Sequence, residues 1–246
     1  MKSPFNNAPF NNNEQYLMLF GCHHKVGTSW FSKILPHIAR DFNLQFQYGD
    51  QTGINTHTDI FFDDHSRLNP DEFQHYRGVH LIRDPRDVII SGFHYHQWTE
   101  EAWANEAKDH WQGMSYKEKL NSLDKHNGLI FEMEHIGRET INEMLAWNYH
   151  NKSFLEIKYE DLLVSQQEIF SKIFQHYNFN KQAIKKCLDI ADQYNFKKMK
   201  KNNAQHLRKG ISGDWKNHFT PLLKEQFKKS FPDALSRLNY EQESNW

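Results

Sequence analysis

Short apolar runs alternate along the chain with longer stretches of helical periodicity. The runs have the length and composition of buried strands: Tyr16–Phe20, Leu44–Tyr48, Ile60–Phe62, Val79–Ile82 and Phe154–Ile157. The helical patterns cover Trp30–Arg40, Asp87–His96, Tyr116–His150 with a break at His126–Gly128, Asp161–Tyr177, Lys181–Tyr194 and Pro221–Leu238. Strands that alternate with helices predict an α/β fold with a central parallel sheet flanked by helices.

The chain of 246 residues suits one undivided domain of this class. Residues 1–14 are polar and rich in asparagine, and are predicted to be a flexible tail. Residues 15–246 would then form a single domain, because no linker or internal repeat interrupts them. The polar, basic stretch Lys197–Gly213 is predicted to be a loop.

Composition narrows the possible partners and the compartment. With 30 basic and 31 acidic residues the net charge is −1, which argues against a nucleic-acid-binding protein. Two cysteines, Cys22 and Cys187, are too few for a disulfide framework, so a cytoplasmic, reducing setting is expected. The N-terminus lacks the pattern of a signal peptide, and the apolar run at Tyr16–Phe20 is too short to span a membrane.

A candidate anion-binding loop, Cys22–Trp30, follows the first strand and opens a helix. Backbone N–H groups at a helix N-terminus attract anions, and Gly27 would let the backbone approach one closely. Thr28 and Ser29 add hydroxyl donors, and Lys25 adds a charge. Because the lysine precedes the glycine, the loop is P-loop-like without matching the nucleoside-triphosphatase motif. Taken alone, the segment also fits an ordinary helix cap.

A second candidate anion site begins where the strand Val79–Ile82 ends. Arg83 would lie at the C-terminal edge of the sheet, where open parallel sheets bind ligands. Ser91, about two turns into the next helix, would add a hydroxyl to the arginine fork. A surface arginine beside a helix cap is the simpler interpretation of the same residues.

A third candidate site lies near the C-terminus. Arg208 and Lys209 precede Gly210, a pairing of cations and glycine that suits a charged ligand. Upstream, Phe196 stands beside a run of lysines, where an aromatic ring could stack on a nucleobase.

Together these segments resemble the cytosolic sulfotransferase family, in order, over residues from about 16 to about 225. The resemblance is carried by Lys25–Trp30, Arg83–Ser91, Tyr159–Leu162, Phe196–Asn202 and Arg208–Thr220. It implies transfer of a sulfuryl group from 3′-phosphoadenosine 5′-phosphosulfate (PAPS) to an acceptor hydroxyl, with adenosine 3′,5′-bisphosphate (PAP) as the product.

The resemblance also implies roles for individual residues. The 5′-phosphosulfate would be held by Lys25, Gly27, Thr28, Ser29 and Trp30. The 3′-phosphate would be held by Arg83, Ser91, Arg208, Lys209 and Gly210, and the adenine would be lined by Trp30, Tyr159 and Phe196. Ser91 would bond Lys25 between turnovers and so restrain hydrolysis of the donor.

The family carries a catalytic histidine after its third strand, and His65 is the residue predicted to fill this role. The residues before it, Asp63 and Asp64, depart from the family's Lys-Thr context and are expected to orient the imidazole ring. His57 matches that local context better but precedes the predicted strand. By analogy with phosphoryl transfer, His65 would accept the hydroxyl proton and Lys25 would stabilise the leaving phosphate, without a metal.

The same residues are compatible with functions of a different class. A metal site at His23–His24 or His94–His96 lacks the usual ligand spacing. The chain could also be a phosphate-loop nucleotide kinase, or a non-catalytic nucleotide-binding protein on the same fold. The kinase is disfavoured because the loop does not end in the Gly-Lys-Ser/Thr pattern.

The acceptor is expected to be a small molecule or a carbohydrate. Five aromatic residues could stack on an acceptor ring: Phe93, Tyr95, Trp98, Trp103 and Trp111. The same residues could equally well belong to the hydrophobic core. Lys216, Thr220 and Glu225 fit the family's dimer motif, but Pro221 interrupts it and argues against that dimer.

Overall fold

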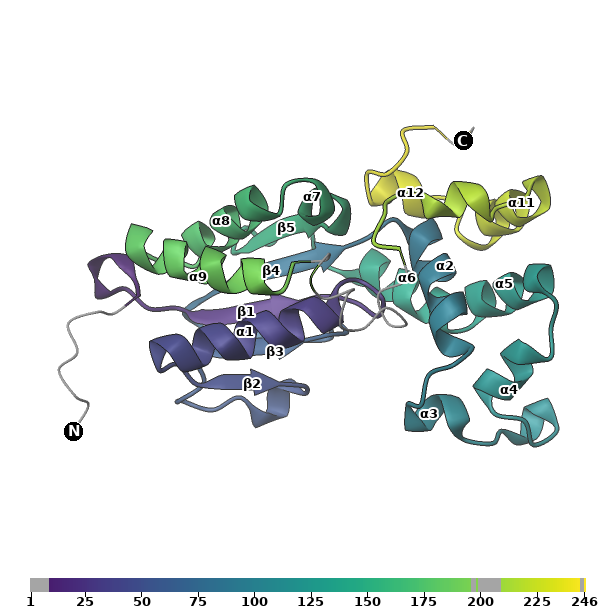
Figure 1. Cartoon of the computed structure of the whole chain (residues 1–246), viewed down its shortest axis with the longest axis horizontal. Coiled ribbons are helices and arrows are strands. Elements are labelled where there is room, and N and C mark those ends of the chain that lie inside the picture. The colour runs from purple at the N-terminus through teal and green to yellow at the C-terminus, as the bar shows by residue number, and fades with distance from the viewer. Residues whose placement is uncertain (1–8, 196–197, 199–208, 244–245) are drawn as a thin grey trace. The chain divides into compact units, whose positions relative to one another are not determined.

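The computed structural model describes residues 9–195, 198, 209–243 and 246, which form two compact units (Figure 1). Among these described residues, the sheet unit comprises those up to 82 and from 148 to 210, and the helical unit those from 83 to 147 and from 211 on. None of the helices in these described ranges combines the length and apolarity that crossing a membrane requires.

The sheet unit is built on five parallel strands in the order β2-β3-β1-β4-β5. Their bounds are β1 Leu17–Gly21, β2 Phe46–Tyr48, β3 Ile60–Asp63, β4 Tyr76–Ile82 and β5 Phe154–Lys158. Helices flank the sheet: α1 Thr28–Phe42, α7 Tyr159–Val164, α8 Gln166–His176 and α9 Lys181–Gln193. The predicted α/β class with a central parallel sheet is therefore confirmed.

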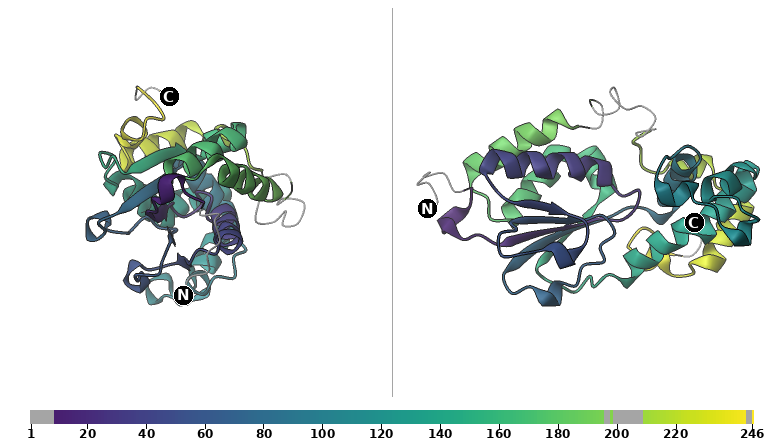
Figure 2. Two further views of the ribbon diagram at one scale, coloured as in Figure 1. Left: turned by 90° about the vertical axis from the view of Figure 1, so that its left-hand side faces the viewer. Right: turned by 90° about the horizontal axis from the view of Figure 1, so that it is seen from below.

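The sheet core is rich in phenylalanine. Phe20 of β1 packs on Phe31 of α1 at 4.2 Å between ring centroids, and Phe61 and Phe62 of β3 are fully buried. Helices α1 and α9 lie side by side, as Figure 2 shows, and Lys186 of α9 donates a hydrogen bond to the Asp41 carbonyl. In the described part of this unit, 3-10 turns lie before β1 at Asn11–Asn13, between β2 and β3 at Gln51–Gly53, and between β3 and β4 at Pro70–Glu72.

The structure differs from the predicted tail at residues 9–14. Phe10 is buried and stacks on Phe179 at 5.1 Å between centroids, and the Asn11 backbone N–H donates to the Asn178 carbonyl. Ordered structure thus begins before residue 15, because an apolar side chain within the polar segment finds a place in the core.

The helical unit contains α2 Pro85–His96, α3 Ala102–Asn105, α4 Tyr116–Asn121, α5 Lys125–Glu134, α6 Ile136–Ala146, α11 Pro221–Ser230 and α12 Ala234–Arg237, with 3-10 turns at Asp109–Trp111 and Asp214–Asn217. The break predicted at His126–Gly128 was wrong. Asp124 caps α5 by accepting the Asn127 N–H, and Gly128 lies inside that helix against Phe93. Pro221 is the first residue of α11, a position where its missing N–H has no cost.

Candidate active site

The loop between β1 and α1 has an unusual backbone conformation at two positions. Lys25 and Gly27 both have left-handed φ angles, 62° and 90°, and Gly27 is the N-cap of the 15-residue helix α1. A Cβ on Gly27 would lie 3.2 Å from the Leu81 Cδ2 atom, so a side chain there would be strained and crowded. The loop therefore turns sharply into the positive end of a long helix.

Short side-chain contacts hold this loop on the sheet. The Cys22 Sγ and Thr28 Oγ1 atoms are 3.4 Å apart, and the Ser66 hydroxyl donates to the Cys22 carbonyl at 2.9 Å. Burial raises the pKa of the Cys22 thiol well above its ordinary value, so the thiol stays protonated and its role is packing.

His65 lies beside this loop, as the sequence predicted. Asp63, the last residue of β3, is in register with Gly21, the last residue of β1, so the segments that follow both strands leave the same edge of the sheet. The His65 ring is parallel to that of His24 in the loop, with 7° between the planes and 6.3 Å between centroids. Two histidines and Lys25 therefore come together at this edge.

Asp63 organises the backbone that carries His65. Its carboxylate accepts N–H groups from His65, Arg67 and Leu68 at 2.7–2.8 Å. The expectation that Asp63 and Asp64 orient the imidazole ring needs correction, because their hydrogen bonds are made elsewhere: Asp64 accepts from the Tyr48 hydroxyl at 2.6 Å. This cap was not predicted, although an aspartate followed by a short polar segment is the usual signal for one.

Replacing Asp63 with alanine should lower the free energy of unfolding by on the order of 2–4 kcal/mol, because several N–H donors lose their acceptor. Asp63→Asn is the matched control, since one amide oxygen can still accept and an intermediate loss is expected. Urea denaturation of the three proteins measures this effect. An alanine variant as stable as the wild type would contradict the capping role.

His57 lies at the other end of β3. It is exposed in the turn that precedes the strand, and the nearby Asp59 carbonyl accepts the N–H of Met18 at the start of β1. Because the strands are parallel, the starts of β1 and β3 share the edge opposite the anion-binding loop. The geometry therefore favours His65 over His57 as the candidate general base.

Trp30 and Tyr159 pack together within the sheet unit. Tyr159 is the first residue of α7, directly after β5, and its ring meets Trp30 edge to face at 6.5 Å. The Trp30 indole N–H is buried and has no acceptor among the described residues. Neither Phe196 nor Arg208 can be placed beside them, since both lie outside the described residues.

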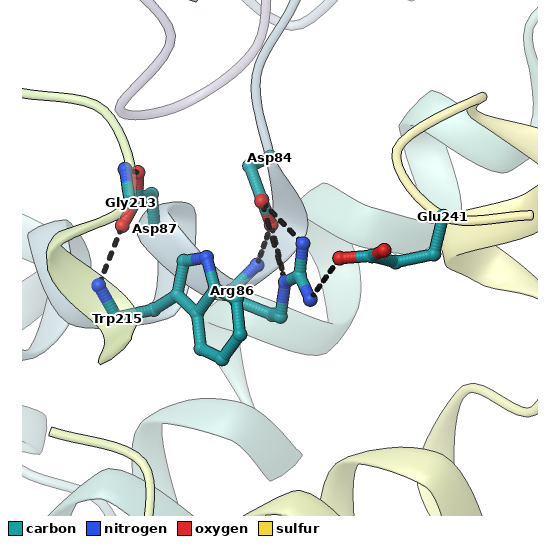
Figure 3. A network of polar contacts seen from close by, with 6 residues as sticks. All are labelled: Asp84, Arg86, Asp87, Gly213, Trp215 and Glu241. Carbon is teal, nitrogen blue, oxygen red and sulfur yellow. Dashed lines mark hydrogen bonds and ion pairs between the residues drawn. The ribbon is translucent and has the colours of Figure 1, made fainter. Parts of the chain in front are cut away.

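The helical unit contains a polar network at the start of α2 (Figure 3). Asp84 caps the helix and accepts from the buried Arg86 guanidinium at 2.7 Å, which also lies 2.8 Å from Glu241. That guanidinium packs on the ring of Trp215 at 3.8 Å and on that of Trp246 at 4.6 Å, and the two rings meet edge to face. This cluster was not predicted, because Trp215, Glu241 and Trp246 lie far along the chain from Asp84 and Arg86.

Asp87, in the first turn of α2, binds the backbone of the segment that follows Gly210. Its carboxylate accepts the backbone N–H groups of Gly213 at 2.7 Å and Trp215 at 2.8 Å (Figure 3). Burial raises the pKa of Asp87, although the Arg83 charge and these donors oppose that rise. Arg83 is half-buried, as is Ser91 in the middle of α2.

Two of the predicted 3′-phosphate residues lie just inside the described part of the C-terminal loop. Lys209 is exposed, and Gly210 has a left-handed φ of 61°. The left-handed angle explains why glycine is placed there.

The aromatic residues proposed for the acceptor are divided between core and surface. Phe93 and Tyr95 are buried in the helical unit, whereas Trp98, Trp103 and Trp111 are half-buried. The ring of Trp111 packs on core residue Phe131 at 5.2 Å between centroids. Much of this set therefore serves the core. Within the described residues, no group of His, Cys, Asp and Glu side chains could hold a metal ion.

The profile of the sulfotransferase domain matches residues 68–239 of this sequence. The chain belongs to the sulfotransferase family. The human protein Sulfotransferase 2A1 is 25% identical over 250 residues, covering 87% of this chain and 82% of that protein. The predicted family resemblance is thus confirmed, and with it the expectation of a sulfotransferase enzyme in general terms.

Solved sulfotransferase structures share the fold. Mouse sulfotransferase SULT7A1, crystallised with PAP, superimposes with a TM-score of 0.63 and 20% identity, covering 93% of this chain and 87% of that one. A retinol dehydratase crystallised with androsterone and PAP gives a TM-score of 0.58 and 18% identity, covering 93% of this chain and 83% of that one. At these identities the similarity concerns the fold.

Proposed function

We propose that this protein transfers a sulfuryl group from PAPS to the hydroxyl of a small-molecule acceptor. The observation that carries the proposal is the arrangement at the end of β1 and β3. There, His65 stacks on His24 of the loop that also carries Lys25, at the N-terminus of α1. The family membership supports sulfuryl transfer, and the PAP bound to the related structures supports the donor.

The anion-binding loop fits the phosphosulfate end of PAPS. Gly27 leaves space where a Cβ would crowd the turn, and the helix N-terminus favours negative charge. Lys25, Thr28 and Ser29 would hold this end, with Trp30 and Tyr159 beside the adenine. The 3′-phosphate would be bound by Arg83, Ser91, Arg208, Lys209 and Gly210, and Phe196 would cover the adenine.

His65 would act as the general base. A neutral imidazole can accept the acceptor's hydroxyl proton, and the cap made by Asp63 holds the His65 backbone in place. Lys25 would stabilise the charge that grows on the bridging oxygen of the departing phosphate. These roles need no metal ion.

A transfer assay with radiolabelled PAPS tests the proposal directly. The panel should contain steroid alcohols, since a related structure holds androsterone, together with phenols and simple sugars. We expect labelled product with at least one small-molecule alcohol. Absence of transfer to every acceptor, together with no binding of PAP, would overturn the proposal.

Arg83→Ala and Arg208→Ala should each weaken PAP binding by on the order of 1.5–3 kcal/mol, since each removes a charge-assisted hydrogen bond to phosphate. Calorimetric titration with PAP measures the loss. Arg40→Ala is the control, because the Arg40 side chain is 71% exposed near the far end of α1. Unchanged affinity in both test variants would remove their assignment to the 3′-phosphate.

A further inference from the structure

A buried hydrogen-bonded chain connects the surface of the sheet unit to the anion-binding loop. The Glu156 carboxylate lies 2.6 Å from His80 Nδ1, and His80 Nε2 lies 2.8 Å from His23 Nε2. Both histidines are fully buried, whereas the Glu156 side chain is 31% exposed. Glu156 belongs to β5, His80 to β4, and His23 to the loop itself, one residue from His24 and two from Lys25.

The strand register aligns the members of this chain. His80 is paired with Gly21 of β1 on one side and with Glu156 of β5 on the other. Gly21 has no side chain, and a Cβ there would lie 2.7 Å from Ser66 Oγ and 3.7 Å from His80 Cδ2. A side chain at Gly21 would therefore clash with the Ser66 hydroxyl, whereas its distance to the His80 ring is that of an ordinary contact. Tyr149 covers the ring edge to face at 5.8 Å between centroids.

The chemistry of the three groups fixes the direction of the hydrogen bonds. Burial lowers the pKa of His80 to about 3, so at pH 7 its ring is neutral and carries one proton. The Glu156 carboxylate can only accept, so that proton is on Nδ1. His80 Nε2 is then an acceptor, and His23 must donate to it from its own Nε2–H.

His23 connects its hydrogen bond with the His80 ring to the backbone of the loop. Its carbonyl accepts the Val26 N–H at 2.9 Å, which closes a turn around His24 and Lys25. Val26 is fully buried and directly precedes Gly27, the N-cap of α1. A shift of the His23 ring would therefore move Lys25 and the start of the helix together.

We propose that His80, oriented by Glu156, is a positioning residue that holds His23 and thereby places the loop that carries Lys25. The expected effect on catalysis rests on the proposed function. The hydrogen-bonded chain itself is independent of that function. An apolar pair would fill the same space without desolvating polar groups. The polar chain instead specifies one orientation of one ring in the loop.

Nitrogen NMR of the histidine-labelled, ligand-free protein tests the chain independently of any activity. We expect His80 in the Nδ1–H tautomer and His23 in the Nε2–H tautomer, assigned from the signals lost in His80→Phe and His23→Gln. Glu156→Ala should remove the preference of His80 for Nδ1–H. Finding His80 in the Nε2–H tautomer in the wild type would overturn the chain, whatever the protein catalyses.

Two substitutions of His23 test positioning. His23→Leu removes the donor and should lower kcat by about 10–100-fold, the usual effect of losing a partner that orients a site. His23→Gln places an amide donor near the position of Nε2 and should restore most of the loss. His176→Leu is the control, because His176 is not part of the chain from Glu156 to His23 and bonds the Ser153 carbonyl, in the segment before β5.

PAP titration accompanies these assays and separates a failure of the proposed function from a failure of the positioning role. Wild-type protein that binds no PAP would count against the proposed function and leave the NMR result standing. If PAP binds and His23→Leu has wild-type kcat and PAP affinity, the positioning role is overturned. Equal losses of kcat in His23→Leu and His23→Gln would also overturn the positioning role, since the hydrogen-bond donor at residue 23 would then not matter.

Discussion

Replacing His65 with alanine should lower turnover by roughly 10²–10⁴-fold and leave the affinity for PAP near that of the wild type. His65 is the histidine that follows β3 at the edge shared with the anion-binding loop, and it stacks on His24 of that loop. A general base acts on the acceptor proton, so its loss affects the chemical step more than donor binding. Single-turnover measurements with calorimetric titration separate the two effects.

His57→Ala is the matched control for this experiment. His57 is exposed and precedes β3, at the edge of the sheet opposite the loop, so its removal should change neither turnover nor PAP affinity. Thermal denaturation should show that both variants remain folded, because the Asp63 cap bonds the His65 backbone rather than its ring. A fully active His65 variant, or a larger defect in the His57 variant, would reassign the base.

Most strands were predictable because they are short apolar runs in the core, although β2 is not fully buried. β3 and β5 match their predicted runs to within one residue, whereas β4 begins at Tyr76, before the predicted run Val79–Ile82. Parallel pairing followed from the alternation of strands with helices. The helical breaks were harder to predict. Residues 161–177 were predicted to be one helix, but Ser165 leaves the helical conformation with φ −133° and separates α7 from α8. Tertiary packing decided such a break, and local periodicity could not.

The loop proposed to bind the anion could be picked out from the sequence because its candidate groups are neighbours in the chain. Lys25, Gly27 and the hydroxyl residues are neighbours, and a left-handed glycine at a helix start has a direct sequence signature. The groups that support the loop were not visible. His80 and Glu156 are 76 residues apart and meet only through the pairing of β4 with β5. Register of this kind depends on the whole sheet, so no short motif encodes it.

Lys25→Met should reduce kcat by about 10²–10³-fold, the usual effect of removing one group that stabilises transition-state charge. The methionine keeps a side chain of similar length without the ammonium. PAPS affinity should fall by a smaller factor, because the charge on the bridging oxygen grows only as the S–O bond breaks. Rapid-quench measurement of sulfate transfer, with PAPS titration in the absence of an acceptor, distinguishes the two losses.

Lys25 has a left-handed φ of 62°, so a backbone effect of the substitution must be separated from the loss of charge. Asparagine tolerates this conformation better than methionine does. If the ammonium is what matters, Lys25→Asn and Lys25→Met should lose comparable turnover, whereas a backbone effect would spare the asparagine variant. Lys33→Met, at an exposed position of α1, controls for the loss of a nearby positive charge. A Lys25→Met enzyme with weaker PAPS binding but unchanged kcat would assign the lysine to ground-state binding alone.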